Sequence, residues 1–487
     1  MKNKWFKWQN IVALTVLIVL GATPLVNEAI EASQERPNII FILTDDFDYA
    51  LMPYMTNTNR LIADEGAVLT NYFVTSSACC PSRSSTFRGQ YPHNTTILEN
   101  SPGFKKFYRN GKTKDTIATW MKRAYYQNSF MGKYLNLYPL GAPENYIAPG
   151  WDDWHVFVDD GTPFYFAYTM NENGEYVRYH KKEYDYSTDV IAGLAQSFIE
   201  SSIENKKPFF VYLSVYAPHG PSIPAPRHSQ LYLDLTYPKK PSFREVDISD
   251  KPQIIQDLSK KDGAYEAEDS PDNQFAKRVQ TMQAVDEMVA SLVKLLDEKG
   301  QLENTYIFFT SDNGFHMGEH SLPNGKMLAY EEDIHVPLVV RGPGIQPGTT
   351  VTQMTANIDI APTIAALAGA RAASFVDGSS FGPFLFPTSE QPAGWRKALL
   401  IETGDLDRES PVIAYRAVRT ENFIYIEYED GELEFYDLIK DPYEMENLAG
   451  KLAPETLTTL HNWLGQLKTC KANECRQLEM NVPDIDY

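Results

Sequence analysis

The chain has 487 residues, of which 43% are hydrophobic and 13% aromatic, so it can bury a large core and is too apolar to be a disordered protein. Its formal net charge is −20 and no basic stripe offsets it, so the surface repels long polyanions and excludes nucleic acid as a partner. The length favours one large α/β domain followed by a smaller one.

The first 32 residues have the pattern of a secretory signal peptide. Lys2, Lys4 and Lys7 precede an apolar run at 11–20 that is too short to span a bilayer comfortably. We expect cleavage after Ala32, with an uncleaved anchor as the alternative. No second long apolar segment follows, so we expect an exported protein (secreted, at the cell surface or in the periplasm) without stable membrane insertion.

Three apolar, β-branched or aromatic runs end in polar residues. They are "RPNIIFILTDD" at 36–46, "KPFFVYLSVYAPHG" at 207–220 and "NTYIFFTSDNG" at 304–314. Such runs are typical of buried parallel strands, and apolar residues at helical spacing over 275–296 predict an amphipathic helix before the third. Because ligands bind at the carboxyl ends of strands in open α/β sheets, the three polar ends are expected to converge.

The pattern changes from about residue 398. Two aromatic-rich runs flank Asp430-Gly431, a hairpin-turn signal, and 453–470 reads as a closing helix. We therefore predict a catalytic α/β domain over 36–395 and a C-terminal subdomain of antiparallel strands with a closing helix over 396–487.

The most informative motif is Cys79-Cys80-Pro81-Ser82-Arg83. Pro81 is suited to the first turn of a helix, which places Cys79 at a helix N-terminus, where free N–H groups and the helix dipole favour an anion. Arg83 adds a fork of donors for a tetrahedral oxyanion. The alternative is a helix start that carries a structural cysteine pair.

This cysteine motif resembles the maturation motif of the sulfatases. The resemblance implies an alkaline-phosphatase-like α/β sandwich with a central, mostly parallel sheet. It also implies that a formylglycine-generating or sulfatase-maturating enzyme oxidises Cys79 to formylglycine, whose hydrate attacks sulfate esters. Cys80 is not the modified residue, because the motif counts from the residue two before Pro81.

The acidic strand ends then read as a metal site. Asp45, Asp46, Asp312 and Asn313 supply hard oxygen ligands, and with an oxygen of modified Cys79 they suit one Ca²⁺, or less well Mg²⁺. A lone Asp-Asp pair after a strand is more often a turn or a helix cap. Two such pairs in a chain with this cysteine motif favour the metal.

Cationic residues follow in the order found in sulfatases. Lys133 in "GKYLN", His219 in "APHGP" and Lys326 in "NGK" match the lysines and histidine that hold sulfate and assist the leaving group, and with Cys79 and Arg83 they form the expected catalytic set. His316 and His320 in "GFHMGEH" are further candidates for lining the pocket, and His93 is a weaker one.

Within the family the chain looks closest to the N-acetylglucosamine-6-sulfatase group, on "CCPSRSS", "GKYLN", "PGWDDWHVF" and "YEEDIHVPLVVRGPG". The resemblance implies removal of 6-O-sulfate from N-acetylglucosamine of host glycans. The long basic insertion of the endosulfatases is missing, which points to exo-action. Phe87 and Arg88 depart from the maturation motif, and Tyr134-Leu135 follow Lys133 where many sulfatases have Lys-x-His.

Cys470 and Cys475 close a short loop that can form a disulfide in an oxidising compartment, with a zinc site as the rival interpretation. Two rivals to the function also stay open. One is an arylsulfatase or a phosphonate or phosphodiester hydrolase of the same superfamily. The other is a catalytically silent carbohydrate-binding protein on this scaffold.

Overall fold

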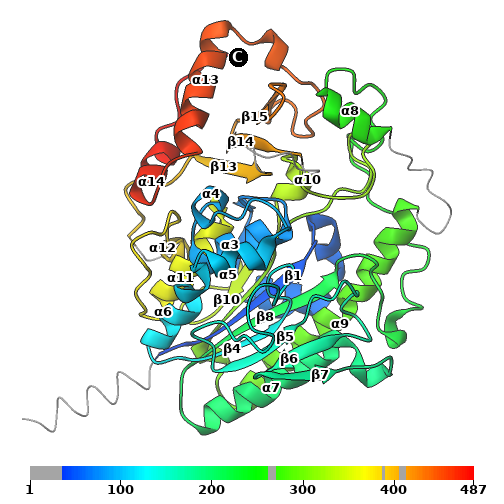
Figure 1. Cartoon of the computed structure of the whole chain (residues 1–487), viewed down its shortest axis with the longest axis vertical. Helices are drawn as coiled ribbons and strands as arrows, with labels where there is room; N and C mark the ends of the chain where they lie inside the picture. The colour runs from blue at the N-terminus through cyan, green and yellow to red at the C-terminus, as the bar shows by residue number, and fades with distance from the viewer. Residues whose placement is uncertain (1–35, 261–269, 387–389, 405–412) are drawn as a thin grey trace, which may run out of the picture.

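The computed structural model describes residues 36–260, 270–386, 390–404 and 413–487. In this part of the chain the strands form a ten-stranded sheet, a four-stranded sheet and a short parallel pair. Helices cover both faces of the large sheet, and the small sheet lies with the C-terminal helices towards the top of Figure 1. The expected signal peptide lies outside the described residues, and within them no helix is long and apolar enough to cross a membrane.

The large sheet is parallel at its centre, with antiparallel pairs on either side and one parallel pair at an outer edge. In spatial order its strands are β11 (Thr349–Val351), β2 (Ala67–Leu69), β10 (Leu338–Arg341), β9 (Thr305–Ser311), β1 (Asn38–Asp45), β8 (Phe209–Pro218), β4 (Gln127–Gly132), β5 (Asp153–Phe157), β6 (Thr169–Glu172) and β7 (Glu175–Arg178). The run β9-β1-β8-β4-β5 is parallel, whereas β10 pairs antiparallel with β9, and β6 with β5. This confirms the predicted mostly parallel sheet.

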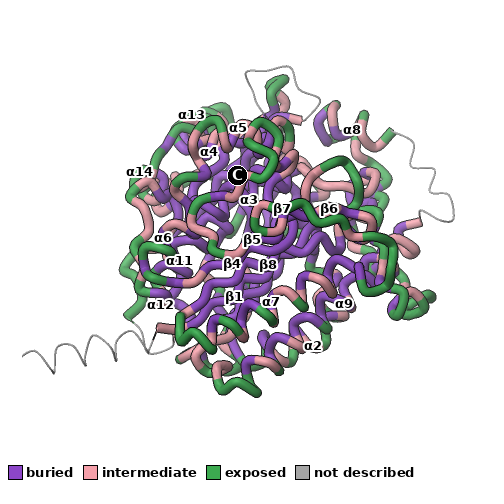
Figure 2. The backbone as a smooth tube through the Cα atoms, turned by 60° about the horizontal axis from the view of Figure 1, so that its bottom comes forward, coloured by how far each residue is buried: buried purple, intermediate pink, exposed green. Residues whose placement is uncertain are grey.

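One face of this sheet is covered by two long helices, α7 (Ser187–Glu204) and α9 (Pro271–Glu298). The apolar residues predicted at helical spacing over 275–296 are buried along α9, among them Phe275, Val285 and Leu296. Figure 2 shows the central strands buried, with α7 and α9 partly exposed on their outer sides. Burying each large aliphatic side chain stabilises the fold by about 1.5–3 kcal/mol, so this face anchors the sheet.

The opposite face is covered by shorter helices. They are α3 (Cys79–Arg88), α4 (Pro92–Thr95), α5 (Gly103–Arg109), α6 (Ile117–Arg123), α11 (Ile360–Leu367) and α12 (Gly382–Leu385). α3 begins at Cys79 as predicted and is capped at its C-terminus by Gly89, whose φ of 63° is the left-handed conformation that glycine adopts without a steric cost. Three more short helices are α2 (Thr56–Thr58), α8 (Gln253–Ser259) and α10 (Glu331–Ile334). A parallel pair, β3 (Tyr72–Phe73) and β12 (Thr355–Ala356), completes the strands.

The C-terminal sheet is an antiparallel meander of β13 (Ala398–Thr403), β14 (Tyr415–Thr420), β15 (Phe423–Tyr428) and β16 (Leu433–Asp437). Asp430-Gly431 lies in the turn between β15 and β16, as predicted, and Gly431 has a φ of 89°. Helices α13 (Pro454–Leu467) and α14 (Asn473–Met480) follow, joined by a Cys470–Cys475 disulfide. The disulfide is therefore confirmed over zinc for this pair, while the domain boundary at residue 395 stays a prediction.

Candidate active site

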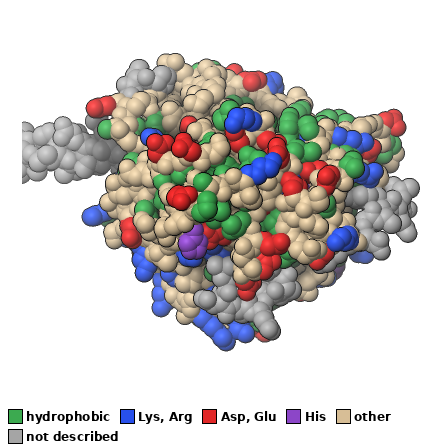
Figure 3. Space-filling view, turned by 90° about the horizontal axis from the view of Figure 1, so that it is seen from above, with side chains coloured by type: hydrophobic (Ala, Val, Ile, Leu, Met, Phe, Trp, Pro, Cys, Tyr) green, Lys and Arg blue, Asp and Glu red, His purple; other side chains and the backbone are tan. Residues whose placement is uncertain are grey.

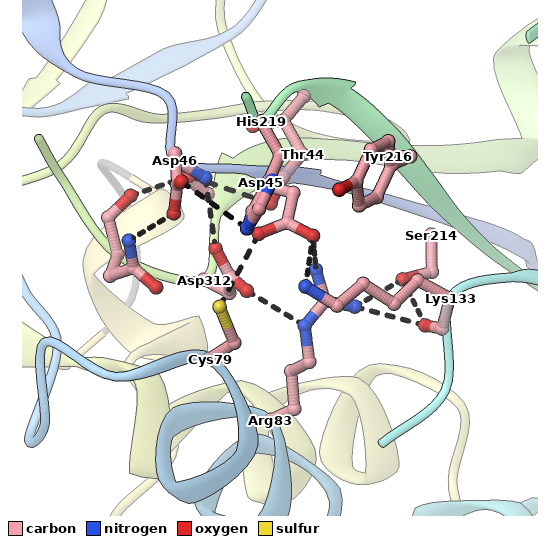
Figure 4. A network of polar contacts seen from close by, with 12 residues as sticks. Thr44, Asp45, Asp46, Cys79, Arg83, Lys133, Ser214, Tyr216, His219 and Asp312 are labelled. Carbon is pink, nitrogen blue, oxygen red and sulfur yellow. Dashed lines mark hydrogen bonds and ion pairs between the residues drawn. The ribbon is translucent and has the colours of Figure 1, made fainter. Parts of the chain in front are cut away.

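Four ionisable residues lie at the carboxyl ends of neighbouring parallel strands. Asp45 is the last residue of β1, and Asp312, His219 and Lys133 directly follow β9, β8 and β4. Because these strands are adjacent in the sheet, their side chains meet at one edge, as Figure 4 shows. The convergence predicted from the sequence is therefore present in the fold.

Cys79 lies at the N-terminus of α3 and faces this edge of the sheet (Figure 4). Its Sγ donates to Asp45 Oδ1 at 3.5 Å and accepts from Lys326 Nζ at 2.7 Å. Burial raises the pKa of the Cys79 thiol to about 12, although Lys133 and Lys326 oppose that shift. An unmodified thiol here stays protonated at neutral pH and is a poor nucleophile.

Arg83 lies one turn further along α3 and is almost completely buried. Its Nε donates to Asp312 Oδ2 at 2.7 Å, and one Nη2–Asp45 Oδ2 ion pair spans 3.4 Å. Nη1 donates to Lys133 O at 2.9 Å and to Ser214 Oγ at 2.5 Å. Burial lowers the pKa of the guanidinium, but the two aspartates outweigh burial and raise it, so the group is a permanent cation.

The two lysines pair with different carboxylates. Lys133 Nζ donates to Asp45, and Lys326 Nζ donates to Asp46 and lies 4.0 Å from Asp45 Oδ1. Gly132 permits the close approach of β4 to β8 beside Lys133: its φ is 106°, and a Cβ at this position would lie 2.0 Å from Ser214 O. No other residue type fits there without moving the strand.

The pKa values of the three carboxyl groups shift in different directions because their neighbours differ. Burial raises the pKa of Asp45, but Lys133, His219 and Arg83 together lower it well below its usual range. For Asp46, Lys326 and His219 likewise outweigh burial and lower the pKa. Burial dominates at Asp312 and raises its pKa despite Arg83. At least two buried anions therefore face the site.

The predicted metal ligands fit a hard cation. Oxygens of Asp45 and Asp46 lie within 4.8 Å of one another and of Cys79 Sγ. Asn313 Nδ2 donates to Asp46 Oδ1 at 2.7 Å, which leaves Asn313 Oδ1 buried and without a hydrogen-bond partner in the described part of the chain. Asp312 Oδ1 accepts from Asp46 N at 3.2 Å. An orphaned amide oxygen beside carboxylates is a donor set suited to Ca²⁺.

His219 lies where the site meets solvent. Its side chain is 30% exposed, compared with 13% for Lys326, 7% for Lys133 and 1% for Arg83. The ring stacks on Tyr216 at 4.7 Å and its Nε2 lies 3.8 Å from Asp46 Oδ2. His219 is therefore the cationic candidate best placed to meet a group that enters from solvent.

The other candidate histidines are placed differently. His316 bonds to Asp333 Oδ1 at 2.8 Å and lines a cavity of about 230 Å³ together with Lys326 and Asn324. His320 is fully buried against Glu245 and Tyr330 and makes no hydrogen bond or ion pair to the residues around Cys79 in the described part of the chain.

His93 lies near the C-terminal sheet and pairs with Glu402, with 2.7 Å between Nδ1 and Oε1. His93 is close to Cys79 along the chain because α4 follows α3, but its side chain pairs with the C-terminal sheet.

Sequence reasoning missed two residues of β8. Ser214 donates to Lys133 O at 2.6 Å while accepting from Arg83, so it fixes Arg83 relative to β4. The Lys133 ammonium lies over the Tyr216 ring, 5.6 Å from the ring centroid. The signal available in the sequence was their two-residue spacing, which places both on the sheet face that carries the site.

Cations around a helix N-terminus at the carboxyl edge of a parallel sheet bind tetrahedral oxyanions, so fold and site define an enzyme of oxyanion esters. The sulfatase family profile matches residues 37–370, well over half of the chain, and the chain belongs to this family of sulfuric ester hydrolases. A profile for the C-terminal region of N-sulphoglucosamine sulphohydrolase matches residues 318–470.

Named relatives cover most of the chain. Human N-acetylglucosamine-6-sulfatase is 35% identical over 95% of this chain and 90% of its own length. An arylsulfatase of Chlamydomonas reinhardtii is 32% identical over 95% of this chain and 79% of its own. A solved structure of a protein in complex with its substrate D-glucosamine-2-N,6-O-disulfate is 25% identical, with a TM-score of 0.73 over 89% of this chain and 97% of that one.

Proposed function

We propose that this enzyme hydrolyses the 6-O-sulfate of non-reducing-end N-acetylglucosamine or glucosamine in host glycans, through formylglycine at position 79 and one Ca²⁺. The observation that carries the proposal is the placement of Cys79, at a helix N-terminus within reach of Asp45 and Lys326. Its neutral, buried thiol is unsuited to the attack, which is a reason for converting it to another nucleophile.

The cofactors would add what the side chains lack. Formylglycine at position 79 would supply, as its hydrate, hydroxyl groups for nucleophilic catalysis, and Ca²⁺ would make one of them more acidic. Asp45, Asp46, Asp312 and Asn313 would hold the ion, with Asn313 Oδ1 as the ligand atom that has no other partner among the described residues.

The chain's own cations would bind the sulfate. Arg83, Lys133 and Lys326 offset charge on the sulfuryl oxygens as it spreads in the transition state, and Arg83 is held rigid by Asp312 and Ser214. His219 or Lys326 would then protonate the leaving sugar oxygen. The greater exposure of His219 favours it, because the sugar enters from solvent.

The substrate assignment rests on the relatives and on charge. The most similar named relatives include N-acetylglucosamine-6-sulfatases, and the related solved structure holds a 6-O-sulfated glucosamine. On the face drawn in Figure 3, acidic and basic side chains are interspersed over most of the surface, and no continuous basic stripe crosses the middle of this face. A surface with a net charge of −20 disfavours the interior of a long polyanion and supports exo-action.

Export and maturation complete the proposal. The lysine-rich start and apolar run of the first 32 residues support a signal peptide, and the Cys470–Cys475 disulfide is typical of an oxidising compartment. A formylglycine-generating or sulfatase-maturating enzyme is the partner required during synthesis. We retain the division into a catalytic domain over 36–395 and a C-terminal subdomain over 396–487.

The test is a substrate panel with matured enzyme. N-acetylglucosamine-6-sulfate should be turned over at least about tenfold faster, in kcat/KM, than galactose-6-sulfate, an aryl sulfate or a phosphonate monoester; tenfold corresponds to 1.4 kcal/mol. Internal 6-sulfates of intact heparin should be released slowly. Preference for galactose or for internal positions would reject the substrate, and preference for the aryl sulfate or phosphonate would favour the rival hydrolases.

Peptide mass spectrometry addresses the nucleophile separately. It should show an aldehyde at residue 79 and a cysteine at residue 80. Fully active protein with unmodified Cys79 would refute the nucleophile, and glycan binding without any aldehyde or turnover would favour the silent binding protein.

A further inference from the structure

A second group of potential ligands lies away from Cys79. His320, Glu332 and Glu444 each offer one atom, and these atoms lie within 4.8 Å of one another. All three side chains are buried, with exposed fractions of 0%, 7% and 1%. They come from the loop after β9, from α10 and from the segment after β16, so the group lies between the large sheet and the C-terminal sheet, near α10 in Figure 1.

Two atoms of this group have no hydrogen-bond partner among the described residues: His320 Nε2 and Glu444 Oε1. A buried polar atom left unpaired costs about 1–3 kcal/mol. Both atoms belong to side chains whose spacing suits a metal ion. Their lack of a hydrogen-bond partner indicates that a bound species accepts an electron pair from each of them.

The remaining atoms of these side chains are fixed by other contacts. His320 Nδ1 bonds to Glu245 Oε2 at 2.8 Å, and its ring stacks on Tyr330 at 4.1 Å. Glu444 Oε2 accepts from Glu331 N at 3.0 Å. A histidine whose second nitrogen bonds to a carboxylate is the usual arrangement around a metal, because the carboxylate fixes the ring and makes the other nitrogen more basic.

The backbone at both residues is also unusual. His320 has a φ of 52° and Glu444 a φ of 56°, in the left-handed region that costs a residue with a Cβ energy. Such conformations persist where the surrounding structure holds them. Both residues also carry an unpaired atom that belongs to the same buried cluster.

The local charge favours a cation. Glu332 and Glu444 are both buried, and each offers a carboxylate oxygen within 4.8 Å of the other. Lys240 Nζ offsets part of this charge by donating to Glu332 Oε1 at 2.8 Å. The remaining acidic groups still repel one another, and a bound cation would relieve that repulsion.

We propose that His320, Glu332 and Glu444 form a structural site for a divalent transition-metal ion, with zinc as the best match. One imidazole nitrogen with two carboxylates suits Zn²⁺, whereas Ca²⁺ and Mg²⁺ prefer oxygen-only sets such as the one beside Cys79. The ion would join α10 to the segment between β16 and α13, and so tie the C-terminal sheet to the catalytic core. The proposal does not depend on the substrate.

Metal content tests the proposal. Full-length matured protein is stripped with chelator, dialysed against Zn²⁺ and Ca²⁺ in turn, and analysed by elemental mass spectrometry. Wild type should bind one zinc per chain, and His320→Gln and Glu444→Gln should lose at least about tenfold in zinc affinity. Asp312→Ala is the matched control, because it removes a ligand beside Cys79 and should retain zinc.

A crystal of the wild-type protein decides the case if the variants fail to fold. Data collected at the zinc absorption edge should show an anomalous peak between His320 Nε2 and Glu444 Oε1. Absence of that peak in zinc-loaded crystals would overturn the proposal and leave a proton shared by Glu332 and Glu444 as the explanation. Loss of zinc in Asp312→Ala alone would overturn it as well.

Discussion

The carboxylates around Cys79 and those around Arg396 are equally buried, yet they are paired differently. Asp45, Asp46 and Asp312 come from two strand ends and converge on one sulfur, sharing their cations with one another. Beside them a buried amide oxygen has no hydrogen-bond partner in the described part of the chain. These charges are held close together without being fully satisfied.

Around Arg396 every oxygen has a partner. Asp359 accepts two hydrogen bonds from its guanidinium, at 2.8 Å from Nη2 and 2.5 Å from Nη1, and Glu479 accepts one from Nε at 3.0 Å. Asp359 precedes α11 and Glu479 lies in α14, so this network joins the catalytic core to the C-terminal helices. Bidentate pairing of this kind fixes geometry and leaves no free ligand atom.

The difference indicates two uses of the same residue types. Under the proposed function, the carboxylates that surround Cys79 would hold an ion and serve the reaction, at a cost in stability that active sites commonly carry. Carboxylates at the boundary are arranged to hold two parts of the chain together. Substitutions in the first region should therefore reduce activity, and substitutions in the second should reduce stability.

The largest effect is expected from Cys79→Ala. Removing the proposed nucleophile should lower kcat by about a millionfold, to background, as loss of a nucleophile does in other hydrolases. The buried thiol is replaced by a methyl group, so we expect the melting temperature to stay within a few degrees of wild type. Turnover by this variant would contradict the view that the residues around Cys79 serve catalysis.

Asp312→Ala should lower calcium affinity by more than the ~10–100-fold typical of changes outside the ligand shell, and activity should fall with it. Calorimetric titration with Ca²⁺ measures the first and steady-state kinetics the second. Asp312→Asn keeps the volume beside Arg83 and separates the loss of charge from the loss of packing. Normal turnover by exhaustively metal-free wild type would show that the ion is not required.

Arg396→Met should lower the free energy of unfolding by about 3–5 kcal/mol, because it leaves Asp359 and Glu479 as unpaired buried charges. Activity per folded molecule should be unchanged, since Arg396 does not contact the site residues. Lys294→Met is the matched control, because Lys294 is exposed and, among the described residues, forms an ion pair only with Glu298 on the surface of α9. Equal destabilisation by both substitutions would remove the distinction between boundary and surface pairs.

His93 provides a smaller, pH-dependent effect. Burial lowers its pKa, but Glu402 outweighs burial and raises the pKa from 6.5 to about 9. Because the folded-state pKa is the higher one, the His93–Glu402 pair stabilises fully below about pH 6.5 and is lost as the pH rises through about 9. Relative to His93→Gln, wild type should lose roughly 3 kcal/mol of unfolding free energy over that range. A pH-independent difference in melting temperature would reject the charged pair.

Much of the active-site region could be predicted from the sequence because its residues follow continuous patterns. Asp45 and Asp312 end apolar strands, and parallel strands place their carboxyl ends at one edge. Cys79 precedes a proline by two positions, which predicts the helix start that the structure has. The meander and the Asp430-Gly431 turn were equally local, and local patterns need no knowledge of distant partners.

Other features depend on contacts between distant parts of the chain, and the sequence gives no local sign of them. Arg396 meets Asp359 and Glu479, which lie 37 and 83 positions away, and Glu444 meets the loop of His320 only because the C-terminal sheet packs against α10. The sequence by itself determined the family, the helix start at Cys79 and the strand ends, since each is encoded in neighbouring residues. Only the tertiary structure decided which buried polar groups are paired and which have no partner among the described residues, because desolvation and pairing depend on packing across the whole fold.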